Sequence, residues 1–162
     1  MIQLFLEKTK NIIREKKILE EKLSVKINIK GNNVSIEGDA LEEYEASIVL
    51  EAMGFGFSAK NAIMLKDPNY SFTELNIKDI KNKNLEVIRS RLIGRQGKTK
   101  KTIESISGCK IIIKEDNRVG IIGYAEELSS AITAITNLIR GSKQSNVYSY
   151  LEKRNTEKKQ NT

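Results

Sequence analysis

The chain contains no histidine, one cysteine and one proline among its 162 residues. A single cysteine, Cys109, excludes an internal disulfide, and the absence of histidine excludes Ser-His and Cys-His nucleophile pairs and removes a common zinc ligand. No apolar run reaches the roughly 18 residues of a membrane span, and the amino terminus lacks the basic start of a signal peptide. We therefore expect a cytoplasmic protein that is not an enzyme, binds no metal or cofactor and contacts no membrane.

Acidic residues are scarce in the second half of the chain. Residues 1–80 contain 11 basic and 13 acidic residues, a net charge of −2, whereas residues 81–162 contain 17 and 8, a net charge of +9. Residues 89–101 include no acid and six basic side chains: Arg89, Arg91, Arg95, Lys98, Lys100 and Lys101. Such a concentrated field attracts polyanions such as RNA, DNA or an anionic membrane surface. Charge alone leaves a merely solvated basic face as an alternative.

The first half predicts an α+β order. Residues 1–8 have the pattern of a short strand, and residues 9–23 repeat apolar residues at helical spacing. Residues 25–39 alternate apolar and polar residues about a Gly-Asn-Asn turn, which is typical of a β-hairpin. An amphipathic helix over residues 40–56 follows, giving the order β, α, β, β, α.

The second half predicts the same order with one insertion. After a connecting segment, residues 57–70, that contains Pro68, the sequence predicts a strand over 71–80 and a helix over 84–93. A Gly-x-x-Gly stretch interrupts the pattern before a second helix. A hairpin and a closing helix then complete the half, at residues 98–108 (helix), 109–116 and 118–125 (strands) and 127–141 (helix).

The glycines of the stretch "LIGRQGKTKKTIE" lie at the junction of those two helices. Glycine inside a helix costs about 1 kcal/mol relative to alanine, so Gly94 and Gly97 indicate a particular backbone geometry rather than helix stability. Without side chains, such a loop can bring its amides and the positive end of the next helix against phosphates. A simple helix–helix turn is the alternative for the tetrapeptide taken alone.

With its context, the stretch "LIGRQGKTKKTIESISGCKIIIKE" resembles the core of a KH domain, whose loop holds about four nucleotides of single-stranded nucleic acid. One departure is Lys100, at a position where the family often has an aliphatic residue. The resemblance implies a groove floored by aliphatic residues such as Leu92. It places the RNA-binding residues at Arg91, Ile93, Gly94, Arg95, Gln96, Gly97, Lys98, Thr99, Lys100, Lys101, Ile111 and Ile113, with no catalytic and no metal-binding residue.

Over nearly its whole length the chain is similar to archaeal ribosomal RNA-processing KH proteins, relatives of the eukaryotic ribosome-assembly factors called Partner of Nob One. The tandem order and the terminal segment "GSKQSNVYSYLEK" are the features that carry this similarity. The resemblance implies two tandem type I KH domains, each a three-stranded sheet packed on three helices. The expected division is residues 1–56, a degenerate KH domain; 57–70, a linker helix and loop; 71–154, the RNA-binding KH domain with its C-terminal helix; and 155–162, a disordered tail.

The first domain is expected to lack the glycine loop, because aligning "VKINI" with "CKIII" places Lys10, Asn11, Ile12 and Ile13 at the loop position. The expected function is therefore single-stranded RNA binding by the second domain. The family resemblance implies the 3′ region of small-subunit rRNA during ribosome maturation. It also implies two protein partners, the endonuclease that trims the rRNA 3′ end and the alpha subunit of translation initiation factor two. Two alternatives stay open: a KH protein of messenger RNA or RNA decay, and a protein-interaction scaffold with incidental RNA contact.

Overall fold

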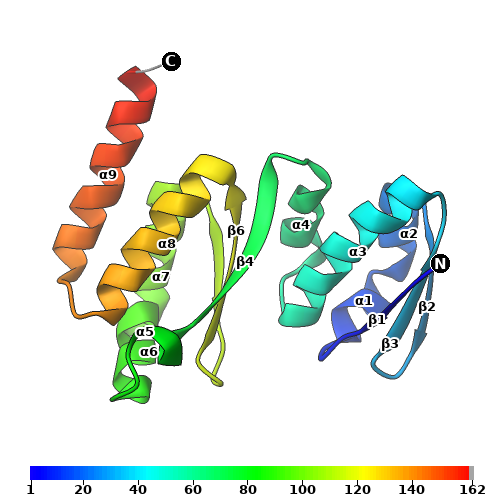
Figure 1. The fold of residues 1–162 in the computed structure, drawn as a ribbon, viewed down its shortest axis with the longest axis horizontal. Coiled ribbons are helices and arrows are strands. Elements are labelled where there is room, and N and C mark those ends of the chain that lie inside the picture. Colours follow the sequence, from blue (N-terminus) through cyan, green and yellow to red (C-terminus); the bar gives the residue numbers. More distant parts are fainter. Residues whose placement is uncertain (161–162) are drawn as a thin grey trace. The chain divides into compact units, whose positions relative to one another are not determined.

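A computed structural model describes residues 1–160 of the chain, which divides into two compact units (Figure 1). The first unit is Met1–Tyr70, and the second begins at Ser71. Each unit contains a three-stranded sheet whose middle strand is the last of its three in sequence. Within the described part of the chain, none of the helices combines the length and the apolar character needed to cross a membrane.

The first unit orders its strands β1-β3-β2, with helices on one face of the sheet (Figure 1). Strands β2 and β3 form the expected hairpin, in which Ile27 is opposite Ile36 and both are buried. The elements are β1 Ile2–Phe5, α1 Lys10–Arg14, α2 Lys16–Leu23, β2 Lys26–Lys30, β3 Asn33–Glu37, α3 Ala40–Phe55, α4 Ala59–Ala62 and the 3₁₀ helix η1 Ile63–Lys66.

A break at Glu15 splits the helix predicted over residues 9–23 into α1 and α2. The residues aligned with the glycine loop therefore lie in helix α1, where Ile12 is completely buried in the core of the unit. A loop that presents its backbone to a ligand cannot form there. The first unit was expected to lack the glycine loop, and it has buried core in its place. The prediction that it is nevertheless one of two tandem type I KH domains is wrong.

The predicted linker is packed into the first unit. Helices α4 and η1 contact α3, and Phe57, Ala62 and Leu65 are buried. The rings of Phe55 and Phe57 stack with their centroids 6.1 Å apart. These apolar side chains explain why the segment folds onto the unit rather than spanning between two units.

The second unit orders its strands β4-β6-β5, which leaves β5 at an edge. Helices α6, α7 and α8 share one apolar core with the sheet, built on residues such as Leu92, Ile103 and Ile121. The elements are β4 Tyr70–Asn76, α5 Ile77–Ile80, α6 Leu85–Ile93, the 3₁₀ turn η2 Arg95–Gly97, α7 Lys98–Ser107, β5 Lys110–Ile113, β6 Arg118–Tyr124, α8 Ala125–Ile139 and α9 Gln144–Gln160.

Cys109 belongs to this core and is completely buried. Burial raises the pKa of its thiol, and the carboxylate of Glu127 adds to the effect, against a hydrogen bond with Ser107 and the charge of Lys158. The thiol is therefore held in its neutral form, as expected of a small packing residue rather than a nucleophile.

Helix α9 packs along α7 and α8 (Figure 1). Val147 and Leu151 are buried, and the amide of Asn155 donates to the carbonyl oxygen of Ile106. The helix continues to Gln160, into the segment expected to be a disordered tail, and near this end Lys158 lies 3.5 Å from the carboxylate of Glu127 in α8. Residues 161 and 162 of that expected tail lie outside the described residues.

Candidate nucleic-acid interface

The glycine stretch forms a tight loop between α6 and α7. Helix α6 ends at Ile93, and Gly94 turns the chain with φ 77° and ψ 173°, a conformation open essentially only to glycine. Arg95–Gly97 then make one 3₁₀ turn, within which Gln96 has φ 57° and Gly97 has φ 76°. Three of the four loop residues thus have positive φ, which explains why no helix runs through the stretch.

Gly94 is required by close packing as well as by conformation. A Cβ atom built on Gly94 would lie 2.6 Å from the backbone nitrogen of Thr99 and still closer to its hydroxyl oxygen. Thr99 is only 4% exposed, so it has no room to move aside. The side chain of Gln144 in α9 also donates to the Thr99 hydroxyl at 3.2 Å. The loop is therefore fixed against α7 and, through Thr99, to α9.

Gly97 serves a different purpose. A Cβ atom there would meet only the end of Lys101, at 3.8 Å, so space does not require a glycine. Gly97 is the N-cap of α7 and has no side chain to bond the first amides of the helix. Uncapped amides and the helix dipole together form a site that favours anions.

The basic residues of the stretch fall into two groups. Arg95, Lys98 and Lys101 are exposed beside the loop, as is Gln96. The other three cations already have partners in the fold. Arg89 donates to Asn117 at 2.6 Å, Arg91 to the carbonyl oxygens of Leu138 (3.1 Å) and Ser142 (2.8 Å), and Lys100 pairs with Glu104 at 3.4 Å.

The predicted groove residues also divide by burial. Leu92 is 2% exposed and Ile111 is 3% exposed, so both are core, whereas Ile93 is 37% exposed and Ile113 is partly exposed. Three of these four residues, all but Ile93, line a narrow crevice, whose full lining is Leu92, Lys100, Ile103, Ile111, Ile113, Val119 and Ile135. Only the two outer isoleucines therefore offer apolar surface to a ligand.

A carboxylate makes this groove more polar than a purely aliphatic one. One oxygen of Glu104 pairs with Lys100, and the other accepts a hydrogen bond from the backbone nitrogen of Ile111 at 2.9 Å. That bond occupies an outward amide of edge strand β5. Because residues alternate along an antiparallel ladder, Ile113 directs its main chain to the same open edge.

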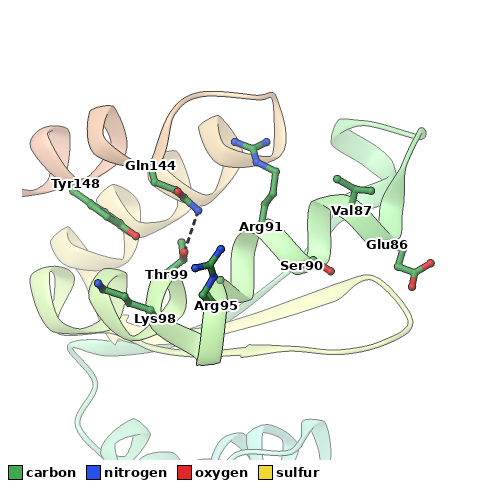
Figure 2. A pocket seen from close by; sticks show the side chains of 10 residues that line it. Glu86, Val87, Ser90, Arg91, Arg95, Lys98, Thr99, Gln144 and Tyr148 are labelled. Carbon is green, nitrogen blue, oxygen red and sulfur yellow. Dashed lines mark hydrogen bonds between the residues drawn. The ribbon is translucent and has the colours of Figure 1, made fainter.

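A pocket of about 750 Å³ lies on another side of the loop (Figure 2). Its walls come from α6, the loop, α7 and α9, and its lining residues are Glu86, Val87, Ser90, Arg91, Gly94, Arg95, Lys98, Thr99, Gln144 and Tyr148. It shares no residue with the groove crevice. Of the predicted site residues, one group lines the pocket and another lines the groove crevice. The pocket has Arg91, Gly94, Arg95, Lys98 and Thr99, and the crevice has Lys100, Ile111 and Ile113.

Of the pocket's walls outside the loop and α7, sequence reasoning named only Arg91 as a site residue. It missed Glu86, Val87 and Ser90 on α6 and Gln144 and Tyr148 on α9. The signal in the sequence was the spacing of Val87, Ser90, Arg91 and Gly94, which places them on one helix face. Gln144 and Tyr148 are likewise four residues apart. Residues of α6 and α9 line the same pocket only because of the path that α9 takes, and no local sequence pattern predicts that path.

A helix, a Gly-x-x-Gly loop and a second helix on a three-stranded sheet define the KH class of domain. The family described as eukaryotic type KH-domain (KH-domain type I) matches residues 71–156, and the chain belongs to this family. Among similar curated proteins are a KH domain-containing protein of Methanocaldococcus jannaschii, 30% identical over 85% of this chain, and the RNA-binding protein PNO1 of Oryzias latipes, 33% identical over 78%. The matched regions span 64% and 55% of the lengths of those relatives.

Solved structures show the same similarity. Dim2p from Pyrococcus horikoshii superimposes with a TM-score of 0.83 and 31% identity, covering 94% of this chain and 98% of the other. Dim2p in a complex with a/eIF2alpha and rRNA from the same organism gives a TM-score of 0.83 and 30% identity, covering 96% and 94%. The chain is thus a relative of the PNO1 and Dim2 proteins.

These comparisons also correct the predicted fold class. The family match covers residues 71–156 alone, and Dim2p matches nearly the entire chain as one structure. The two three-stranded sheets are consistent with a KH fold, but the chain is a single KH-like structure and not a pair of tandem type I KH domains.

The two glycines should respond differently to alanine. Gly94→Ala forces a side chain against buried Thr99 in a glycine-only conformation, so we expect a loss of about 2–4 kcal/mol in the free energy of unfolding. Gly97→Ala meets no clash and should cost about 1 kcal/mol for its left-handed backbone. Denaturant unfolding of both variants measures the difference, and equal losses would contradict the geometry described for Gly94.

Proposed function

We propose that the chain binds single-stranded RNA through the Gly94–Gly97 loop, and that its target is the 3′ region of small-subunit rRNA during ribosome maturation. The observation that carries the proposal is the loop, where Gly97 has no side chain to cap the amino terminus of α7, beside exposed Arg95 and Lys98. KH loops of this kind hold about four nucleotides.

Different parts of the site serve phosphates and bases. Phosphates meet the first amides of α7 and the exposed cations Arg95, Lys98 and Lys101. Bases meet the apolar surface of Ile93 and Ile113 and the open edge of β5. In this proposal Arg91 acts indirectly, because its two hydrogen bonds hold the turn after α8 against α6.

The relatives support the choice of target and partners. A Dim2p similar over 96% of this chain was solved together with a/eIF2alpha and rRNA. We extend both ligands to this chain, with the alpha subunit of translation initiation factor two as one protein partner. The endonuclease that trims the rRNA 3′ end is the second partner. The proposed protein is cytoplasmic and acts by binding rather than by catalysis.

Protein binding by the first unit is a second function that one observation favours. Of the nine exposed large hydrophobic residues in the described part of the chain, six lie within residues 1–70, among them Phe5 at 73% and Leu41 at 68% exposure. Exposed apolar side chains of this size suit a protein surface better than an RNA backbone. Partners held there should remain bound to the full chain after nuclease digestion, and loss of every partner on digestion would contradict this second function.

Replacing Arg95 and Gln96 with aspartate tests the RNA site without touching the glycines. Both side chains are exposed, so the melting temperature should move little. Two carboxylates would then face the phosphates, and repulsion of about 1–3 kcal/mol should weaken RNA binding by about tenfold to a hundredfold. Fluorescence anisotropy with single-stranded rRNA oligonucleotides and a thermal melt measure the two effects.

Lys17→Asp with Asn32→Asp makes the same change of net charge at exposed positions of the first unit and serves as the matched control. We expect this control to keep most of the RNA affinity. A folded loop variant that binds RNA as tightly as the parent would mean that "GRQG" is only a helix–helix turn.

A further inference from the structure

The pocket beside the loop has the chemistry of a nucleotide site. Arg95 and Lys98 are exposed at its rim, and the guanidinium of Arg91 adds positive charge from the wall. Glu86 is the single acid among its lining residues. Its volume of about 750 Å³ falls within the range of small-molecule sites. An electropositive pocket of this size suits one nucleotide of an RNA chain.

Tyr148 supplies the surface for a base. Its ring is half-buried and extends from α9 toward Thr99 and Lys98 across the pocket (Figure 2). Base stacking on an aromatic ring contributes about 1–3 kcal/mol and tolerates any base. Contact with the apolar core holds the ring in place, because Tyr148 also packs against the buried residues of this unit.

The walls of the pocket are held together by bonds between elements that are distant in sequence. Gln144 donates to Thr99 and thereby ties α9 to α7. Arg91 donates to the carbonyl oxygens of Leu138 and Ser142 and thereby ties α6 to the turn before α9. A preformed pocket avoids most of the ordering cost that a flexible site would incur on binding.

The position of the pocket indicates which nucleotide it takes. Gly94 and Arg95 belong to both the loop and the pocket, whereas the groove crevice shares no residue with the pocket. A second hollow also adjoins the loop at Arg95 and Gln96, but its lining has no aromatic side chain, whereas the pocket has Tyr148. The pocket therefore suits the base of the next nucleotide better. We propose that the pocket binds a nucleotide flanking the four held by the loop, with its base stacked on Tyr148 and its phosphate at Arg95 and Lys98. This inference rests on the RNA-binding function proposed above.

Trimming an RNA tests the inference on the full chain. An oligonucleotide of about ten residues from the 3′ region of small-subunit rRNA is shortened one nucleotide at a time from each end, toward the four that a KH loop holds. For the parent protein, removal of one flanking nucleotide should weaken binding about fivefold to tenfold. For Tyr148→Leu, removal of the same nucleotide should no longer weaken binding. For Tyr148→Phe, which keeps an aromatic ring, its removal should weaken binding as in the parent.

Tyr150→Leu is the matched control, since Tyr150 lies two residues along α9 and outside the pocket. In this variant, removal of the flanking nucleotide should weaken binding as much as in the parent. Thermal melts check that each variant is folded. If removal of the flanking nucleotide weakens binding equally in the parent and in Tyr148→Leu, the flanking-nucleotide site is overturned, while the proposed function of the loop is unaffected. Absence of binding by the parent at every RNA length would contradict the proposed function and the inference together.

Discussion

The close approach of Gly94 to Thr99 is the constraint on which the proposed RNA site depends. Thr99 is buried, so the backbone at Gly94 can adopt its position only without a side chain. At this contact α6 ends, and α7 starts one short turn later without a side-chain cap at its amino terminus. Because Gln144 also bonds Thr99, the same contact connects the loop to α9. Loop and pocket therefore share one fixed reference point, since Gly94 and Thr99 both line the pocket, and a change at Gly94 should disturb both.

The basic stretch acts through two kinds of cation. Three cations have partners within the fold. Arg89 bonds the side chain of Asn117, Arg91 bonds the main-chain oxygens of Leu138 and Ser142, and Lys100 pairs with the carboxylate of Glu104. Exposed cations such as Arg95 and Lys98 remain on the surface around the loop. Only this second kind can neutralise phosphates at small cost, because the first kind would have to give up hydrogen bonds in partly buried positions. The number of basic residues in the sequence thus overstates the number of phosphate contacts.

Local patterns were sufficient for most of the secondary structure and for the loop. Alternation about Gly31 predicted the first hairpin, and the glycine spacing predicted the loop at Gly94. Tertiary contacts decided the rest. Ile12 is buried, so the segment of the first unit that aligns with the loop belongs to the core. Helix α9 runs past residue 154 into the predicted tail, where Lys158 pairs with Glu127 of α8. The pocket forms only because α9 returns past α6, which no short-range pattern specifies. The repeated element order therefore predicted two similar sheets, and the alignment of "VKINI" with "CKIII" predicted that the first unit lacks the glycine loop; neither showed that Ile12 fills the core at that position.

An NMR titration of the full chain with single-stranded RNA from the 3′ region of small-subunit rRNA tests the central claim most directly, because it follows every backbone amide at once. Binding at the loop should shift the amide signals of Gly94–Lys101 and of Ile113 on the edge strand. The signals of residues 1–70 should stay in place. Shifts confined to the first unit, with the loop signals unchanged at saturating RNA, would contradict the assignment of the Gly94–Gly97 loop as the RNA-binding site.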